Sequence, residues 1–185
     1  MTRKPPPDIE TTGSRIVYQN RWLRVREDGI RRRDGSESIY SVIDKPNFAV
    51  IAALHDDRRL HLVQQFRYPM GARFWELPQG AWEDRPDADY LELAHGELRE
   101  ETGLRAARMV DAGELQLAPG LSSQRYHVFL ATGLTQGESA LEQSEQDLIA
   151  RAFPLAEVER MIRDGEIRDA TTVAALGLLR LKGLI

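Results

Sequence analysis

Three glutamates near the middle of the chain have the spacing of a metal-binding helix face. Glu97, Glu100 and Glu101 stand at positions i, i+3 and i+4, and Gly103 follows them. At 3.6 residues per turn this spacing places all three carboxylates on one face of a helix, and a glycine is typical of the residue after the last turn. Clustered carboxylates bind hard cations through oxygen, so the pattern indicates a site for Mg²⁺ or Mn²⁺ with bridging phosphates. A solvated acidic helix is the alternative, because an exposed like-charge pair costs only about 0.2–0.5 kcal/mol.

The residues before these glutamates supply the other parts that such a helix needs. Leu91, Ala94 and Leu98 fall together on a different face, which gives the helix an apolar side to bury. Upstream, residues 74–80 read Phe-Trp-Glu-Leu-Pro-Gln-Gly and predict a short strand that ends at Pro and Gly. We therefore expect a strand, a loop over 80–86 and a helix to hold the carboxylates.

This strand, loop and helix resemble the Nudix box. The family pattern is G-x5-E-x7-R-E-U-x-E-E-x-G-U, in which U is apolar. The residues that match its glycines, its last three glutamates and its apolar positions are Gly80, Glu97, Leu98, Glu100, Glu101, Gly103 and Leu104. The resemblance implies the Nudix fold, an α/β/α sandwich with a mixed sheet in the α+β class, here with a small N-terminal antiparallel β-sheet.

The first half of the box departs from the family pattern. The spacing from its first glycine to Glu97 is two residues longer, and the position of the loop glutamate falls on Ala88, with Asp87 and Asp89 beside it. The arginine expected before Glu97 is replaced by Gly96. In the family this arginine and the loop glutamate form a structural salt bridge. The absence of both residues need not be costly, whereas removing only one partner would leave the other as an unpaired buried charge.

Length and composition fit one catalytic core with an appendage. With 185 residues, of which 42% are apolar, the chain can fill one substantial core. The absence of cysteine excludes disulfides, a thiolate nucleophile and thiolate zinc sites. A net charge of -4 argues against nucleic acid as the main partner, and no apolar run approaches the ~20 residues of a membrane span. The first residues lack the apolar region of a signal peptide, so we expect a cytoplasmic protein.

The order of the remaining elements predicts three parts. We expect a disordered tail over 1–13, an antiparallel sheet over 14–45 and a Nudix domain over 46–185. The sheet is expected to contain strands at 15–18 and 22–25 and a hairpin over 29–42. Outside the box, the Nudix domain is expected to contain strands at 48–54, 60–66, 109–117 and 125–130 and helices at 155–163 and 170–181. A three-stranded appendage cannot cover its own apolar residues, so we expect a homodimer in which each sheet packs over the other subunit.

The appended sheet and four further segments are similar to the ADP-ribose pyrophosphatase group. The segments are 64–69, 76–80, 118–120 and 164–172, and the marker proline of the group corresponds to Pro119, 15 residues after Leu104. The resemblance implies Mg²⁺- or Mn²⁺-dependent hydrolysis of a nucleoside diphosphate sugar, above all ADP-ribose to AMP and ribose 5-phosphate. Two alternatives stay open. Residues 77–80 are also similar to dinucleoside polyphosphate hydrolases, and the altered box would suit a degenerate module that binds a nucleotide sugar without cleaving it.

The same resemblance assigns the catalytic residues. It makes Glu97, Glu100 and Glu101 metal ligands and adds the backbone carbonyl of Gln79. A further carboxylate, acting as ligand or general base, is expected from residues 141–148. The family position in that loop falls on Gln146, which cannot act as a base, so the candidate is Glu145, with Glu142 and Asp147 as substitutes and a merely acidic loop as the alternative.

The substrate-binding candidates lie outside the box. Arg67 ends an apolar strand, and its planar guanidinium suits bidentate binding of phosphate, although a surface charge on an edge strand is the alternative. In the group, the nucleobase is held across the dimer partly by the N-terminal sheet, which implicates Trp22 and Arg24, with Pro119 as the substrate-side marker. Phe48 and Tyr126 are further aromatic candidates for stacking on the base. All three aromatic residues fit core positions at least as well, and for Phe48 a core position is favoured.

Overall fold

The computed structural model describes residues 7–82, 84–85, 87–138 and 147–185. The chain divides into two compact units. The first comprises Met1–Pro46 and Gln116–Gln124, and the second comprises Asn47–Leu115 and Arg125–Ile185. The second unit carries the predicted metal-binding helix.

The first unit is a three-stranded antiparallel sheet. Its strands are β1 (Ile9–Gln19), β2 (Arg24–Arg32) and β3 (Glu37–Asp44), in the order β1-β2-β3. The β2–β3 turn contains Gly35 at φ 84°, a conformation that glycine adopts without strain. The expectation of a disordered tail through residue 13 is wrong from Ile9 onward, because β1 pairs with β2 as far as Ile9, which faces Arg32, although the register shifts between Thr11 and Gly13. Trp22 lies in the β1–β2 turn and not in a strand.

A segment that comes late in the chain completes this first unit. In residues 116–124, the carbonyl of Leu121 accepts a hydrogen bond from the Ile43 N–H at 3.0 Å, and the Ser122 hydroxyl donates to the Ile43 carbonyl at 2.6 Å. The Tyr40 hydroxyl donates to the Gly120 carbonyl at 2.9 Å. These contacts join segments about 80 positions apart, so no local pattern could have predicted them.

The second unit is built on a mixed sheet. Its strands are β4 (Phe48–Leu54), β5 (Arg59–Arg67), β6 (Ala72–Glu76), β7 (Gln79–Gly80), β8 (Leu104–Gln116), β9 (Arg125–Gln136) and β10 (Ile149–Pro154), and its helices are α1 (Tyr90–Thr102), α2 (Leu155–Arg163) and α3 (Ala170–Leu181). The main path runs β10-β5-β4-β9-β8, with β6 paired to β5 and β7 paired to β4. Strand β4 runs parallel to β9 and antiparallel to β5, which makes the sheet mixed. Among the described residues, no helix is long and apolar enough to cross a membrane.

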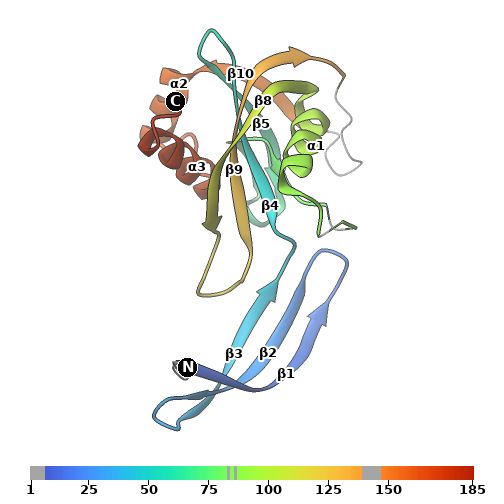
Figure 1. Cartoon of the computed structure of the whole chain (residues 1–185), viewed down its shortest axis with the longest axis vertical. Coiled ribbons are helices and arrows are strands. Elements are labelled where there is room, and N and C mark those ends of the chain that lie inside the picture. The colour runs from blue at the N-terminus through green and yellow to red at the C-terminus, as the bar shows by residue number, and fades with distance from the viewer. Residues whose placement is uncertain (1–6, 83, 86, 139–146) are drawn as a thin grey trace, which may run out of the picture. The chain divides into compact units, whose positions relative to one another are not determined.

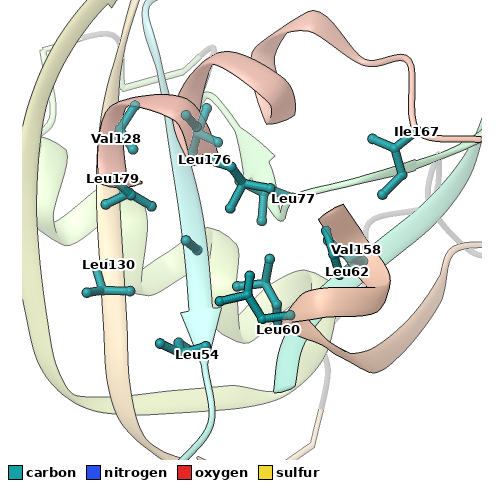
Figure 2. Close-up of a cluster of buried hydrophobic side chains, with 14 of the residues drawn as sticks. Leu54, Leu60, Leu62, Leu77, Val128, Leu130, Val158, Ile167, Leu176 and Leu179 are labelled. Carbon is teal, nitrogen blue, oxygen red and sulfur yellow. The ribbon is translucent and has the colours of Figure 1, made fainter. Parts of the chain in front are cut away.

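Alternate residues of β4 serve two hydrophobic cores. Val50, Ala52 and Leu54 face the cluster that contains residues of α2 and α3, part of which is drawn in Figure 2. Ala49 and Ile51 face a second cluster with residues of α1. All seven β4 residues are therefore buried, as the continuous apolar run predicted. Figure 1 shows α1 on one face of the sheet and α2 and α3 on the other, which confirms the α/β/α sandwich.

Helix α1 has the predicted ending but a different buried face. The Asp89 carboxylate caps its start by accepting hydrogen bonds from two backbone N–H groups, and Gly103 ends it at φ 73°. Leu93, Ala94 and Leu98 are buried, whereas Leu91 is 45% exposed. The expectation that Leu91 belongs to the apolar face is therefore wrong, since Leu93 takes that place against the sheet.

Candidate active site

Glu97 and Gly80 meet where α1 crosses strand β7. A Cβ atom placed on Gly80 would lie 2.2 Å from Oε2 of Glu97, so the carboxylate occupies the space that any larger residue would need. Only 6% of Glu97 is exposed. The packing of Glu97 therefore requires a glycine at position 80.

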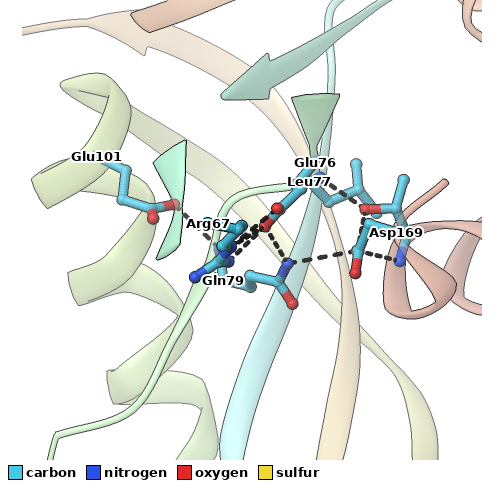
Figure 3. Close-up of polar contacts among 7 residues, drawn as sticks. Arg67, Glu76, Leu77, Gln79, Glu101 and Asp169 are labelled. Carbon is cyan, nitrogen blue, oxygen red and sulfur yellow. Dashed lines mark hydrogen bonds and ion pairs between the residues drawn. The ribbon is translucent and has the colours of Figure 1, made fainter. Parts of the chain in front are cut away.

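Glu101 contacts the neighbouring residue of the same strand. The backbone N–H of Gln79 donates a hydrogen bond of 3.0 Å to Oε2 of Glu101, which is 2% exposed (Figure 3). Gln79 and Gly80 pair with Val50 and Ala49 of the central strand β4. Two buried carboxylates one turn apart on α1 are therefore held against two backbone positions of the sheet.

Glu100 lies apart from this pair. Its Oε1 accepts a hydrogen bond from the adjacent Arg99 at 3.2 Å, and its side chain is partly exposed. Within the described ranges, no three acidic or histidine side chains converge on one point. All three glutamates lie on α1 as expected, but Glu97 and Glu101 are buried against β7 and do not face solvent. Glu100 would have to turn away from Arg99 to join them.

Arg67 is engaged by a glutamate that sequence reasoning did not single out. Its Nε donates to Glu76 Oε1 at 2.9 Å, and its Nη2 pairs with Glu76 Oε2 (Figure 3). The hydrogen bond that Arg67 donates to Glu76 raises the pKa of the Arg67 guanidinium further above its usual value. Glu76 is 2% exposed, whereas 40% of the Arg67 side chain is exposed. Arg67 therefore neutralises a buried carboxylate and still reaches solvent.

The side chain of Gln79 links this ion pair to α3. Its Nε2 donates to Glu76 Oε2 at 3.0 Å and lies 3.4 Å from Asp169 Oδ2. Asp169 caps α3 through the Thr172 N–H at 2.8 Å and accepts from the Thr172 hydroxyl, which in turn accepts from the Leu77 N–H at 2.9 Å. Leu77 is thus held by a hydrogen bond to α3, and Gln79 contacts both α1 and the residue that caps α3.

Two signals could have identified these partners. Glu76 is the one carboxylate in the expected strand 74–80, and a buried charge in a strand requires a partner. Asp169 precedes Thr171-Thr172 at the start of a predicted helix, where a capping residue is expected. Neither signal shows which strand residue the cap contacts.

The other predicted site residues lie elsewhere. Trp22 is 50% exposed, with the Arg21 guanidinium 4.4 Å from its ring, and Arg24 pairs with Asp44 at 3.2 Å, all within the first unit. Pro119 is exposed in the 116–124 segment of that unit. Glu145, like Glu142, falls outside the described residues.

Asp147 is described, and it contacts Arg73. Its carboxylate accepts a hydrogen bond from Nη1 at 2.5 Å, and its backbone carbonyl accepts one from Nη2 at 2.5 Å. The substitute role considered for Asp147 as a base would require it to leave this arginine.

The donor set fits a hard divalent cation. Glu97 and Glu101 offer carboxylate oxygens, and both lie beside the backbone of β7, where carbonyl oxygens are also at hand. The chain has no cysteine, so soft thiolate ligands are excluded. Oxygen-only ligands of this kind suit Mg²⁺ or Mn²⁺.

Comparison with known proteins identifies the family of the chain. Residues 9–43 match the family model of the nucleoside diphosphate sugar hydrolase N-terminal domain, and residues 45–176 match that of the NUDIX domain. The ADP-ribose pyrophosphatase of Mycobacterium tuberculosis (strain ATCC 25618 / H37Rv) is 32% identical over 170 residues, which cover 91% of this chain and 82% of that protein. The ADP-ribose pyrophosphatase of Bacillus subtilis (strain 168) is 25% identical over 174 residues, covering 94% and 93%.

A solved structure gives the same fold. The crystal structure of an ADP compounds hydrolase matches with a TM-score of 0.82 at 21% identity and covers 99% of this chain and 100% of that chain. The NUDIX match spans most of the sequence and contains both the box glycine and the buried glutamates. The chain therefore belongs to the Nudix hydrolases, with the N-terminal domain found in nucleoside diphosphate sugar hydrolases.

Proposed function

We propose that this Nudix hydrolase cleaves the pyrophosphate bond of a nucleoside diphosphate sugar, with ADP-ribose as substrate and AMP and ribose 5-phosphate as products. The packing of Glu97 and Glu101 against Gln79 and Gly80 is the observation that carries the proposal. The N-terminal domain match and the two ADP-ribose pyrophosphatases among the relatives support this substrate class.

The reaction requires water to attack one phosphorus while the bridging P–O bond breaks and the other phosphate leaves. Mg²⁺ or Mn²⁺ held by Glu97, Glu101, the Gln79 carbonyl and a rotated Glu100 would neutralise the diphosphate and lower the pKa of the attacking water. The Gln79 N–H keeps the Glu101 carboxylate oriented, and the Glu76 and Asp169 contacts keep Gln79 in place. Glu145 is our candidate for the group that takes the proton of the water.

Arg67 has two roles in this proposal. Its Nε and Nη2 are directed at Glu76. They hold the carboxylate that accepts a hydrogen bond from the side-chain amide of Gln79. The exposed part of the guanidinium is our candidate for contact with a substrate phosphate, since its charge persists at any physiological pH. Trp22, Arg24 and Pro119 are kept as candidates for the nucleoside side.

We also propose that the protein is a homodimer assembled through its first unit. Large apolar side chains of this unit are exposed to solvent: Ile9, Ile16, Val17, Tyr18, Trp22, Ile39 and Tyr40. A three-stranded sheet with so much exposed apolar surface needs a partner. Light scattering should give twice the monomer mass at micromolar concentration, and Ile16→Glu with Tyr18→Glu should shift the protein toward monomer. A wild-type monomer under these conditions would contradict the dimer.

One assay tests the substrate assignment. Wild type and Glu101→Gln are incubated with Mg²⁺ and ADP-ribose, GDP-mannose, UDP-glucose or diadenosine polyphosphates, and products are separated by chromatography. We expect ADP-ribose to give AMP and ribose 5-phosphate with the highest kcat/KM, and Glu101→Gln to lose this activity. Preference for a diadenosine polyphosphate would favour the dinucleoside polyphosphate hydrolase. Binding of ADP-ribose without any product would favour a degenerate module.

A further inference from the structure

The indole of Trp82 lies directly over Gly96 of helix α1. A Cβ atom on Gly96 would be 2.2 Å from Cζ2 of the ring and 3.0 Å from Cη2, so the ring occupies its place only because residue 96 is glycine. Trp82 is half-buried and packs against the α1-side core cluster, which includes Leu93, Ala94 and Leu98. The ring therefore joins the loop after the box strand to the middle of α1.

Arg85 covers the ring from its own loop and returns to the helix. Its guanidinium carbon lies 4.7 Å from the centre of the Trp82 ring, and its backbone N–H donates to the Trp82 carbonyl at 3.2 Å. The same guanidinium contacts both carboxylate oxygens of Glu92 on α1, at 2.9 and 3.0 Å. The loop is thus attached to α1 at two places, by an aromatic ring and by an exposed ion pair.

The aromatic attachment is adjacent to the catalytic pair. Trp82 comes two residues after Gly80, and Gly96 immediately precedes Glu97. The Trp82–Gly96 contact and the Gly80–Glu97 contact consequently lie side by side between the same two segments. The two contacts therefore share the same pair of segments, α1 and the chain from Gly80 to Trp82.

We propose that Trp82 is a positioning residue that holds α1 and β7 together, so that Glu97 and Glu101 stay against Gly80 and Gln79. This inference rests on the proposed function for its kinetic consequences. The position that holds arginine in the Nudix box is here the glycine that admits the ring. The contact between Trp82 and Gly96 thus replaces the family's salt bridge in holding the box loop against α1. The altered first half of the box is therefore compatible with an active enzyme.

The kinetic test compares Trp82→Ala, Trp82→Phe, Gly96→Ala and the double variant Trp82→Ala/Gly96→Ala. We expect Trp82→Ala and Gly96→Ala each to lower kcat by about 10- to 100-fold and to raise the Mg²⁺ concentration needed for half-activity, since a displaced supporting residue typically has an effect of this size. Trp82→Phe should recover most of the loss. Once the indole is absent, Gly96→Ala should have no further effect, so the double variant should match Trp82→Ala.

A control separates positioning from general loss of stability. Phe153→Leu removes the edge-on contact with Trp75, 4.8 Å between ring centres, in the other core cluster. It should lower the midpoint of urea unfolding while kcat and the Mg²⁺ requirement stay at wild-type values. Equal kinetic losses in Phe153→Leu and Trp82→Ala would overturn the proposal, and so would multiplicative losses in the double variant.

A second readout does not depend on activity. Amide hydrogen exchange of peptides covering 77–82 should become about tenfold faster in Trp82→Ala and Gly96→Ala, because the Gln79 N–H loses its fixed partner, while exchange in β4 stays slow. Unchanged exchange in both variants would overturn the inference. If the wild type cleaves no substrate in the panel, the proposed function fails, and hydrogen exchange still decides whether Trp82 holds β7 against α1.

Discussion

The backbone N–H of Gln79 donates to Oε2 of Glu101 at 3.0 Å, and this hydrogen bond joins the box strand to the helix that carries the acidic residues. A charge-assisted bond of this kind is stronger than a neutral one. It fixes the direction of one carboxylate oxygen in a buried setting, where a misplaced carboxylate would be costly. The catalytic proposal depends on this geometry.

Replacing Glu101 by glutamine tests the charge without removing the side chain. The amide oxygen can still accept from the Gln79 N–H, so the fold should persist with an unchanged circular dichroism spectrum. The loss of one ligand charge should lower kcat by about 100-fold or more, since a bound metal contributes several kcal/mol to the transition state. Glu100→Gln should likewise lower kcat if Glu100 turns to the metal. Wild-type turnover in both variants would refute the assignment of this face.

Gly80→Ala tests the contact between the box glycine and Glu97. The added methyl would lie 2.2 Å from a carboxylate oxygen of Glu97, and the carboxylate can move away because it ends a flexible side chain. We therefore expect a lower urea midpoint, because a buried carboxylate is displaced, and a loss of kcat of about tenfold or more. Gly177→Ala is the matched control, since nothing lies within 4 Å of its added Cβ and its helical position should gain about 0.5–1 kcal/mol. Full activity of Gly80→Ala would show that Glu97 need not lie there.

Several features of this site could be read from the sequence, and others could not. Helices at 155–163 and 170–181 and the Gly103 ending were predicted correctly, because hydrophobic period and capping residues act locally. The Trp82–Gly96 contact, the Arg67–Glu76 pair and the docking of 116–124 on β3 depend on which segments fold together. Leu91 was misplaced for the same reason, since the sheet decides which side of α1 is covered.

Removal of Arg67 should strand the buried Glu76 carboxylate. Arg67→Ala is expected to lower the free energy of unfolding by about 2 kcal/mol, because the buried Glu76 carboxylate loses its charged partner, and solvent at the partly exposed Arg67 keeps the loss below that of a fully buried pair. Arg73→Ala is the control, since Arg73 pairs with the exposed Asp147 and should cost about 1 kcal/mol or less. Adding Glu76→Gln to Arg67→Ala should recover part of the loss. Equal urea midpoints for the two single variants would show that the buried Glu76 carboxylate does not depend on Arg67.

His61 should make stability depend on pH. Burial, followed by the nearby His55 and Arg59, lowers the pKa of His61 to about 4 from 6.5. The unfolded chain therefore binds a proton between pH 6.5 and 4 that the folded chain does not, so stability is full above pH 6.5 and falls as the pH decreases toward 4. The decrease assigned to His61 should reach about 2–3 kcal/mol by pH 4.5. His61→Phe should flatten this part of the curve in urea titrations, whereas His95→Gln, at an exposed position of α1, is the control. An identical slope in wild type and His61→Phe would contradict the prediction.

The most direct test of the account is to locate the metal. Crystals of the full chain soaked in Mn²⁺ give anomalous scattering peaks that mark each ion independently of the substrate. We predict ions within about 2.0–2.6 Å of oxygens of Glu97 and Glu101 and of the Gln79 carbonyl, with Glu100 turned away from Arg99 toward them. Manganese bound only at other acidic residues, with Glu97 and Glu101 still packed against β7 and no ion between them, would contradict the central claim.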